Sequence, residues 1–362
     1  MPSSLYIHIP FCRHLCAYCD FPKVVYDRRW GFSYLAALKK ELESFAPKGP
    51  FKTVYIGGGT PSALSEKELN VLFLMVRPYL SSDTEFTIEA NPEDLNEEKL
   101  LLFLENGVNR LSVGIESSSK RLLALMNRHH TFEDAKKGIE RAKRLGFKRL
   151  SADLIYGLPK ESLEELDSDI EAFLSLDIDH LSAYCLSVNP MTVFYRNGVK
   201  EMDEERASAQ YERILERFRN AGYRRYEVSN FARNGDLSRH NLVYWHDEEY
   251  IGIGLGASGY IGKKRYTNTK NLARYLSFDW GRSEETLSKE SELEDYFLTN
   301  LRLDDGFSLA DFEKRFGFSF MDRYKDVFER ESKLGLLTLK DGRLFASDRG
   351  IEILDSVLLS LF

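Results

Sequence analysis

Short runs of β-branched and aromatic residues alternate with longer amphipathic segments through the first two thirds of the chain. The short runs predict strands, whereas the longer segments repeat apolar residues at helical spacing. Six strands are expected, at Leu5–Ile9, Thr53–Ile56, Glu85–Glu89, Arg110–Gly114, Arg149–Ile155 and His180–Leu186. This alternation is typical of repeated β-α units around a parallel sheet.

Capping signals support the helices expected between these strands. Ser65 and Glu68 form a capping box, and Gly146 follows a helix whose last turn carries basic residues. The expected helices are Phe32–Phe45, Glu66–Val76, Glu97–Asn106, Ser118–Met126, Phe132–Leu145 and Ser162–Leu174. Six units are too few for a closed eight-unit barrel. The predicted fold class is therefore α/β, an incomplete (β/α)6 barrel, with a flat doubly wound sheet as the alternative.

The rhythm changes after about residue 200. A helix at Glu204–Ala221 and a strand in YRRYEVSNF precede a Gly-rich and aromatic-rich stretch, Asn234 to Thr269, that has no clear period. The pattern of the tail predicts three helices, at Ser291–Asn300, Leu309–Phe316 and Phe320–Lys333. A hairpin is expected after them, with one strand at the sequence LLTL and the return strand at Leu344–Ala346. We therefore expect a barrel at 1–230, a connecting segment at 231–283 and a small helical, winged-helix-like module at 284–362.

Charge and hydropathy narrow the class of protein. The chain has 362 residues with 50 Lys and Arg against 57 Asp and Glu, so its net charge is −7. That acidity argues against a nucleic-acid partner and against bulk attraction to anionic lipid. No apolar run reaches the ~18 residues of a membrane-spanning helix, and the start MPSSLYIHIP does not resemble a signal peptide. We expect a cytoplasmic protein without a transmembrane segment.

Three of the four cysteines form a C-x3-C-x2-C run, at Cys12, Cys16 and Cys19, directly after the first expected strand. Three thiolates on one tight loop suit a [4Fe-4S] cluster and leave one iron open to a ligand, whereas ferredoxins normally use four thiolates. A structural zinc site and three unrelated thiols are the alternatives; His14, a candidate fourth zinc ligand, is expected to be exposed. Cys185 stands alone and is read as a buried apolar residue.

The cysteine run, together with YIHIPFC, GGGTP, EANPE and DLIYGLP, resembles the radical S-adenosylmethionine superfamily. The closest resemblance is to the branch that contains oxygen-independent coproporphyrinogen III dehydrogenase and the HemW-type haem chaperones, and it extends over essentially the whole chain. It implies an S-adenosylmethionine ligand whose amine and carboxylate bind the open iron. It also implies a reduced electron donor.

The resemblance also implies a set of residues around S-adenosylmethionine. These are Tyr6, Tyr18, Gly58, Gly59, Thr60, Glu89, Glu116, Arg128 and Asp153. Each has a plainer alternative: the glycines could form an ordinary tight turn, Glu89 could be an acid at a helix start, and Tyr18 could pack without covering the cluster. Asp153 within a strand is costly unless it is paired, which favours a site residue.

One position departs from the pattern of the relatives. They commonly have Gln at the end of the fourth strand, where this chain has Glu116. A carboxylate loses the two N–H donors of an amide and adds a negative charge. A contact between this position and a second ligand carboxylate is therefore in doubt.

Two features distinguish the two functions found in this branch, the dehydrogenase and the haem chaperone. The dehydrogenase branch carries a further cysteine two residues after the third, and this chain has Phe21 there. The chain also contains H-N-x-x-Y-W, a motif associated with haem in HemW-like proteins, at His240, Asn241, Tyr244 and Trp245. An imidazole can bind haem iron, and the aromatic rings offer flat apolar faces to a porphyrin. The alternative is an ordinary aromatic packing cluster with a satisfied histidine.

These features favour a haem-binding chaperone that delivers haem to acceptor haemoproteins, including acceptors at the membrane surface. The alternative is an enzyme, the oxygen-independent coproporphyrinogen III dehydrogenase. No catalytic residue is assigned, and the residues leave open whether S-adenosylmethionine is cleaved. Two weaker features carry no function: Gly252–Gly259 is expected to form a permissive loop near the barrel mouth, and His129 and His130 are expected at the surface.

Overall fold

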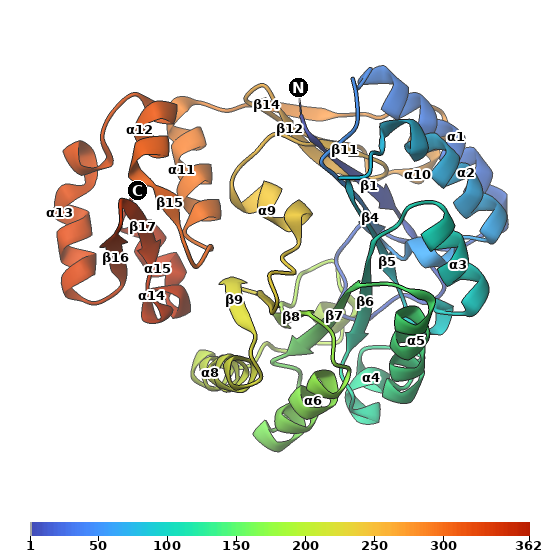
Figure 1. Ribbon diagram of the computed structural model, residues 1–362, viewed down its shortest axis with the longest axis horizontal. Helices are drawn as coiled ribbons and strands as arrows, with labels where there is room; N and C mark the ends of the chain where they lie inside the picture. The colour runs from blue at the N-terminus through green and yellow to red at the C-terminus, as the bar shows by residue number, and fades with distance from the viewer. Residues whose placement is uncertain (1) are drawn as a thin grey trace.

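The computed structural model describes residues 2–362, and a curved nine-stranded sheet forms its centre (Figure 1). Seven neighbouring strands run parallel, in the order β11-β1-β4-β5-β6-β7-β8. Their bounds are β1 Ser4–Ile9, β4 Thr53–Gly58, β5 Glu85–Ala90, β6 Arg110–Glu116, β7 Arg149–Tyr156, β8 His180–Cys185 and β11 Ile251–Ile253. All six predicted strands are present, and they lie side by side in chain order.

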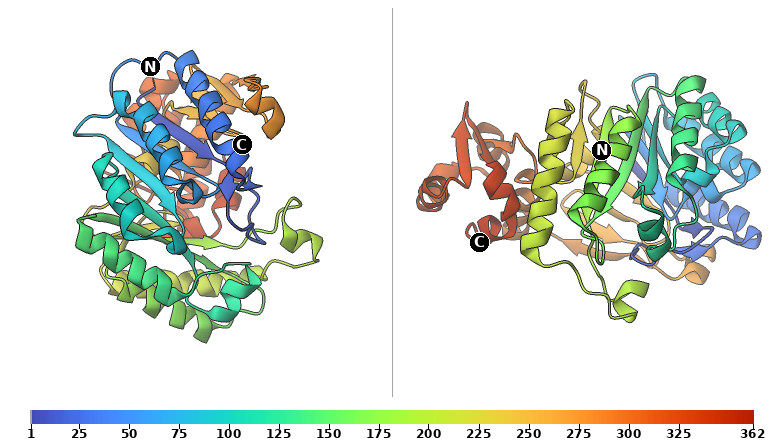
Figure 2. Two further views of the ribbon diagram at one scale, coloured as in Figure 1. Left: turned by 90° about the vertical axis from the view of Figure 1, so that its right-hand side faces the viewer. Right: turned by 90° about the horizontal axis from the view of Figure 1, so that it is seen from below.

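Helices cover the outer side of the curved sheet (Figures 1 and 2). They are α1 Arg28–Ser44, α2 Glu66–Val76, α3 Glu97–Glu105, α4 Lys120–Leu125, α5 Phe132–Leu145, α6 Leu163–Ser175 and α8 Glu204–Asn220. Short 3-10 turns occur at Pro61–Ala63, Arg77–Tyr79 and Pro92–Asp94. One-sided cover does not match the doubly wound alternative, in which helices lie on both faces of the sheet.

Side chains alternate between the two faces of the strands, as strand geometry requires. Ile56, Ile88 and Val113 are fully buried, and they belong to the core that the outer helices cover. Residues adjacent to these along the same strands, such as Thr87 and Ser112, line a cavity on the inner side. The interior of the curved sheet is therefore polar.

The segment after α8 adds more to the sheet than its sequence predicts. β9 (Arg224–Glu227) and β10 (Asn230–Ala232) extend the sheet antiparallel from β8. α9 (Arg239–Trp245) follows, and β11 then pairs with β1. The stretch expected to lack a clear period thus contains a strand of the central sheet. Three residues with Gly252 in the middle are too short to show strand alternation.

Smaller elements flank the sheet. β2 (Phe11–Cys12) and β3 (Val24–Val25) enclose the cysteine loop, and α7 (Val193–Arg196) lies in an excursion after β8. A second sheet contains β12 Ser258–Ile261, β13 Lys264–Thr267 and β14 Ser283–Thr286, with α10 at Leu272–Leu276.

The C-terminal module stands beside the open edge of the sheet, with α9 between them (Figure 1). It contains α11 Lys289–Asn300, α12 Leu309–Phe316, α13 Phe320–Lys333, α14 Asp348–Glu352 and α15 Leu354–Leu359, with strands β15 Phe307–Ser308, β16 Leu337–Lys340 and β17 Arg343–Ala346. The three predicted helices and the predicted hairpin are present. A bridge between Glu227 and Leu303 joins the module to β9, which covers an otherwise exposed sheet edge.

The predicted domain boundaries and the winged-helix description stay predictions. Within residues 2–362, no helix is both long and apolar enough to cross a membrane.

Candidate functional site

The three clustered cysteines lie on one loop beyond the carboxyl end of β1. Cys12 is buried on β2, while Cys16 and Cys19 are half-buried. Burial raises the pKa of the Cys12 thiol to about 12; Thr60, whose hydroxyl lies 3.7 Å from the sulfur, lowers this pKa, and Cys16 and Cys19 raise it further. The three sulfurs are thus close enough to repel one another as thiolates. A group that supplies positive charge to all three, such as an iron–sulfur cluster, fits this loop.

Within the described residues, no three His, Cys, Asp or Glu side chains are arranged to hold one metal ion. Cubane thiolates each bind a different iron, so a cluster does not require them to converge on one point. Cys185, expected to be buried, is exposed. It is the last residue of β8, whose final two residues are exposed, and it lies outside the loop.

The glycine turn at the end of β4 is shaped by the protein's own side chains. A Cβ on Gly57 would lie 2.7 Å from Glu89 Oε1, and a Cβ on Gly59 would lie 2.7 Å from the carbonyl carbon of Pro10. Gly58 has a φ of +114°, and a Cβ there would overlap the His8 ring. The turn therefore needs glycine for its own packing, and its contact with S-adenosylmethionine stays a prediction.

Glu89 faces the interior next to that turn. Its Oε2 accepts the Gly58 backbone N–H at 2.9 Å, and its Oε1 accepts the Tyr55 hydroxyl at 2.8 Å. Burial raises the pKa of Glu89, although these two donors act in the opposite direction. Tyr6 belongs to the same group: its hydroxyl lies 3.0 Å from His8 Nδ1, and the nearby Glu89 raises its pKa, after burial itself.

Glu116 and Arg128 join the end of β6 to the cysteine loop. The Tyr18 hydroxyl donates to Glu116 Oε1 at 2.9 Å, and Arg128 Nη1 lies 3.5 Å from Cys16 Sγ. Arg128 also donates to the Gly114 carbonyl. Burial raises the pKa of Glu116, while Arg128 and Tyr18 lower it. The carboxylate that replaces the expected amide is thus held by a phenol and balanced by a guanidinium.

Asp153 lies deeper in the interior, on β7. Burial raises its pKa to about 8, and the neighbouring Glu116 adds to that rise. The Ser112 hydroxyl lies 3.4 Å from Asp153 Oδ2. Asp153 and Glu89 both line a cavity of about 60 Å³ whose wall is rich in hydroxyl groups. The structure therefore brings the predicted acidic residues Glu89, Glu116 and Asp153 together at the carboxyl side of one interior.

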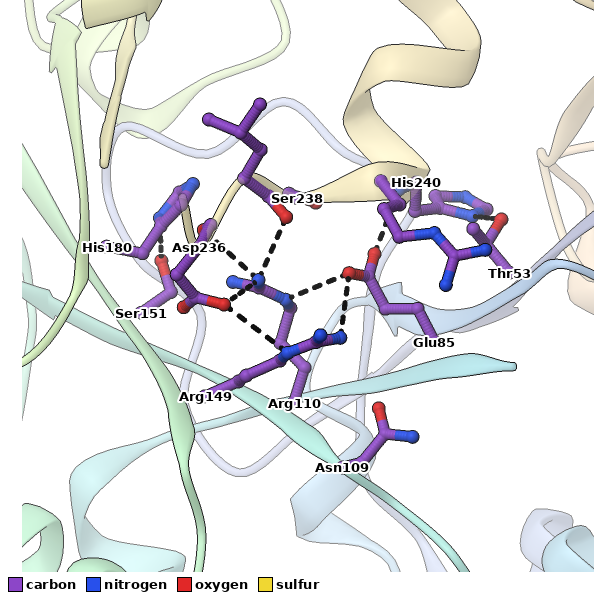
Figure 3. Close-up of polar contacts among 12 residues, drawn as sticks. Thr53, Glu85, Asn109, Arg110, Arg149, Ser151, His180, Asp236, Ser238 and His240 are labelled. Carbon is purple, nitrogen blue, oxygen red and sulfur yellow. Dashed lines mark hydrogen bonds and ion pairs between the residues drawn. The ribbon is translucent and has the colours of Figure 1, made fainter. Parts of the chain in front are cut away.

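A second polar cluster lies at the opposite, amino edge of the sheet (Figure 3). Five consecutive strands each begin with a polar or charged residue, namely Thr53, Glu85, Arg110, Arg149 and His180. None of these five residues was predicted to belong to a site. The sequence does contain a signal for this cluster. Each of the five residues begins a predicted strand, and the amino ends of parallel strands meet at one edge of a sheet.

Arg110 is the centre of this cluster. Its Nη2 donates to Asp236 Oδ1 at 2.6 Å, to the Asp236 carbonyl at 3.1 Å and to the Leu237 carbonyl at 3.0 Å. Its Nε lies 3.3 Å from Glu85 Oε2. Arg149 contacts the same two acids, at 3.4 Å from Asp236 and 3.7 Å from Glu85. The loop before α9 is thereby fastened to the amino edge of the sheet.

His240, the first residue of the H-N-x-x-Y-W motif, lies in this cluster and is 1% exposed. Its Nδ1 lies 2.7 Å from the Thr53 hydroxyl, and its Nε2 lies 2.9 Å from the Tyr244 hydroxyl. Its ring stacks on Tyr55 with a centroid distance of 5.0 Å. Burial lowers the pKa of His240 to about 3, so the imidazole is neutral at physiological pH. Both ring nitrogens are engaged by the protein in this conformation.

The rest of the motif faces two directions. Asn241 lines the interior cavity. Tyr244 packs edge-to-face on His240 with a centroid distance of 5.2 Å. Trp245 lies under Arg302, whose guanidinium carbon is 4.5 Å from the ring centroid. The motif therefore forms a packed cluster between the sheet and the C-terminal module. In this conformation it has the features of the alternative interpretation, an aromatic packing cluster with a satisfied histidine.

Two further expectations concern single histidines and the glycine-rich loop. His14 and His129 are exposed as expected, but His130 is buried, and its Nε2 lies 3.0 Å from the Ile115 carbonyl. The expectation for His130 was wrong, because the chain turns inward after α4 to pack beside β6.

The glycine-rich loop after β11 lies near the cysteine loop, since a Cβ on Gly256 would overlap Pro22.

Comparisons with known proteins agree with this arrangement. The Radical SAM superfamily model matches residues 6–173, and the HemN C-terminal domain model matches residues 287–353. The chain is 38% identical over 365 residues to heme chaperone HemW of Lactococcus lactis, covering 98% of this chain and 96% of that protein. It is 33% identical over 385 residues to the bovine mitochondrial radical S-adenosyl methionine domain-containing protein 1, covering 99% and 87%.

A solved structure supports the fold. Coproporphyrinogen III oxidase (HemN) from Escherichia coli, described as a radical SAM enzyme, superposes with a TM-score of 0.86 at 23% identity, covering 99% of this chain and 90% of that chain. At that identity the match concerns the fold. Together with the near-full-length sequence relatives, it means that the chain belongs to the radical S-adenosylmethionine superfamily and, within it, to the HemW family.

Proposed function

We propose that this protein is a haem-binding chaperone that delivers haem to acceptor haemoproteins in the cytoplasm or at the membrane surface. The observation that carries the proposal is the near-full-length similarity to proteins named heme chaperone HemW, at 38% identity in two bacteria. Phe21 supports it, because it stands where the dehydrogenase branch has a further cysteine and is 61% exposed. His240, Asn241, Tyr244 and Trp245 are the residues that we assign to haem.

The proposal includes a [4Fe-4S] cluster on Cys12, Cys16 and Cys19, with S-adenosylmethionine on the open iron. When bound and reduced by an electron donor, such a cluster supplies an electron to the sulfonium. Arg128 places a positive charge 3.5 Å from the Cys16 sulfur. Tyr6, Tyr18, Gly58, Gly59, Thr60, Glu89, Glu116 and Asp153 surround the proposed ligand position.

The finer description of the fold belongs to the same proposal. We describe the six sequential parallel strands as an incomplete (β/α)6 barrel and the C-terminal module as winged-helix-like. The proposed cluster and S-adenosylmethionine then lie at the carboxyl end of the barrel, where β/α barrels carry their sites. The haem motif lies at the other end, on α9.

Product analysis tests the function. Cluster-reconstituted protein is incubated anaerobically with coproporphyrinogen III, S-adenosylmethionine and a reductant, and porphyrin products are separated. We expect no vinyl-group formation. In a second arm, haem-loaded protein is mixed with an apo-haemoprotein, and transfer is followed by absorption against a control with free haem. Vinyl formation, or transfer no faster than from free haem, contradicts the proposal.

A further inference from the structure

α9 is held in a position that is incompatible with haem ligation by His240. Iron binding requires one free imidazole nitrogen, and both nitrogens are engaged, at 2.7 Å from Thr53 and 2.9 Å from Tyr244. The stacked Tyr55 ring covers one face of the imidazole. A porphyrin plane therefore has no access to His240 until α9 moves.

The contacts that oppose this movement are concentrated at the start of the helix. Glu85 Oε1 accepts the His240 backbone N–H at 3.0 Å, while the other oxygen of Glu85 faces Arg110. Arg110 holds the preceding loop through Asp236 and Leu237 (Figure 3). Glu85 and Arg110 side chains are 0% and 2% exposed, so little water screens their interaction.

The far end of the helix is fastened to a different part of the chain. Asp247 Oδ2 lies 2.5 Å from Arg315 Nη2 of α12, and Asp247 Oδ1 lies 3.2 Å from Arg265. Trp245 lies under Arg302. The barrel therefore holds the start of α9, and the C-terminal module holds its end.

Resting on the proposed function, we propose that Arg110, Glu85 and Asp236 are positioning residues that keep the haem motif closed. Haem binding by His240 then requires release of the loop at 236–238 from the amino edge of the sheet. Arg110 is the residue through which the barrel controls this release, because it contacts both the loop and the acid that accepts the His240 N–H while its side chain is buried. Arg149 contacts the same two acids from a side chain that is 44% exposed. Haem uptake is thus limited by the opening of α9.

Stopped-flow haem binding tests this proposal on the full chain. A gated site gives an observed rate that reaches a plateau as haem concentration rises, and the plateau equals the opening rate. Asp236→Asn keeps the side-chain size and an acceptor oxygen but removes the charge that faces Arg110 and Arg149. We expect this variant to raise the plateau about tenfold, and Glu85→Gln, which keeps the acceptor for the His240 N–H, to raise it also.

Asp167→Asn is the matched control. Asp167 pairs with Arg217 at 3.2 Å and with Arg213 at 3.6 Å between α6 and α8. Asp167→Asn therefore removes a carboxylate that also faces two arginines, but on the more exposed outer helices. We expect its plateau to equal that of the parent protein. Hydrogen exchange of peptides over 236–246, without haem, supplies a readout independent of binding and is expected to be faster in Asp236→Asn and Glu85→Gln but unchanged in Asp167→Asn.

The outcomes separate the two proposals. Haem binding with a His240-dependent spectrum, but with the same plateau and exchange rates in all variants, overturns the gating and leaves the chaperone function standing. Failure of every form to bind haem overturns the function and, with it, the gating that rests on it. A plateau and exchange that rise equally in Asp167→Asn also overturn the gating, because the effect is then one of general stability.

Discussion

The hydroxyl oxygen of Thr53 lies 2.7 Å from Nδ1 of His240, although 187 positions separate the two residues along the chain. Thr53 begins β4, and Gly58 ends it. A strand of this length spans about 17 Å, so one strand connects the histidine of the haem motif with the glycine turn beside the cysteine loop. The two proposed ligand positions lie at opposite ends of the same interior.

Gly58→Ala is expected to destabilise the protein more than Gly49→Ala. Both glycines have positive φ, +114° and +77°, but a Cβ on Gly58 would overlap the His8 ring, whereas a Cβ on Gly49 meets no atom within 4 Å. Overpacking of this kind costs about 1–3 kcal/mol. Denaturant unfolding of the two variants measures the difference, and equal losses would show that His8 moves aside freely.

Much of this architecture follows from the sequence because its signals are periodic. The strands Thr53–Ile56 and Glu85–Glu89 were predicted almost to their ends, since apolar residues on alternate positions pack under the outer helices. β11 was missed because three residues carry no period. A strand without its own pattern is specified by its neighbour, here by pairing with β1.

The site was predicted less evenly, for a physical reason. The spacing of Cys12, Cys16 and Cys19 is local, so the loop could be read directly. The pairing of Tyr18 with Glu116 joins residues 98 positions apart. Burial of His240 on α9 depends on Thr53 and Tyr55 of β4, far away in the sequence. The motif residues can be recognised in the sequence, but which of their atoms are already engaged depends on contacts between distant segments.

Asp153→Asn is expected to stabilise the protein, and more so at high pH. Burial raises the pKa of Asp153 to about 8, so the folded state holds a proton that the unfolded chain releases near pH 3.8. Stability contributed by the neutral form therefore falls as pH rises from about 4 to 8, and Asn mimics that neutral form.

Thermal unfolding at pH 5 and pH 8.5 measures this dependence. The gain in Tm from Asp153→Asn should be larger at pH 8.5, with the exposed Asp83→Asn as the control that shows no such trend. A gain that is equal at both pH values would place the Asp153 pKa near its ordinary value.

Replacement of Cys12, Cys16 or Cys19 by Ser is expected to abolish the cluster. Each thiolate holds one iron, and a serine hydroxyl is a poor ligand for it. Iron and sulfide analysis after anaerobic reconstitution should fall from about four of each per chain to below one. Cys185→Ser, at the exposed end of β8, is the control that should retain the cluster.

Glu116→Gln is expected to raise the affinity for S-adenosylmethionine several-fold. The amide still accepts the Tyr18 hydroxyl, now at 2.9 Å from the carboxylate, but it removes a negative charge and leaves Arg128 free to attract the ligand carboxylate. Anaerobic calorimetry measures the change, with Glu165→Gln in the exposed pair with Arg121 as the control. A weaker affinity would mean that the charge of Glu116 itself contacts the ligand.

His240→Ala is expected to remove the absorption band of histidine-bound haem, whereas His246→Ala leaves it unchanged. The two histidines belong to the same helix and its cap, but only His240 lies against the Tyr55 and Tyr244 rings, which offer apolar faces to a porphyrin. Loss of the Thr53 hydrogen bond will also weaken the attachment of α9.

His240→Asn separates ligation from stability, because its amide can keep a hydrogen bond to Thr53 but cannot replace an imidazole on iron. If His240→Asn retains the band, the axial ligand is another residue. If His240→Ala and His240→Asn both keep the absorption band, the motif packs α9 and binds no iron. Loss of the band in His240→Asn with the unfolding midpoint preserved is the result that assigns the imidazole to haem.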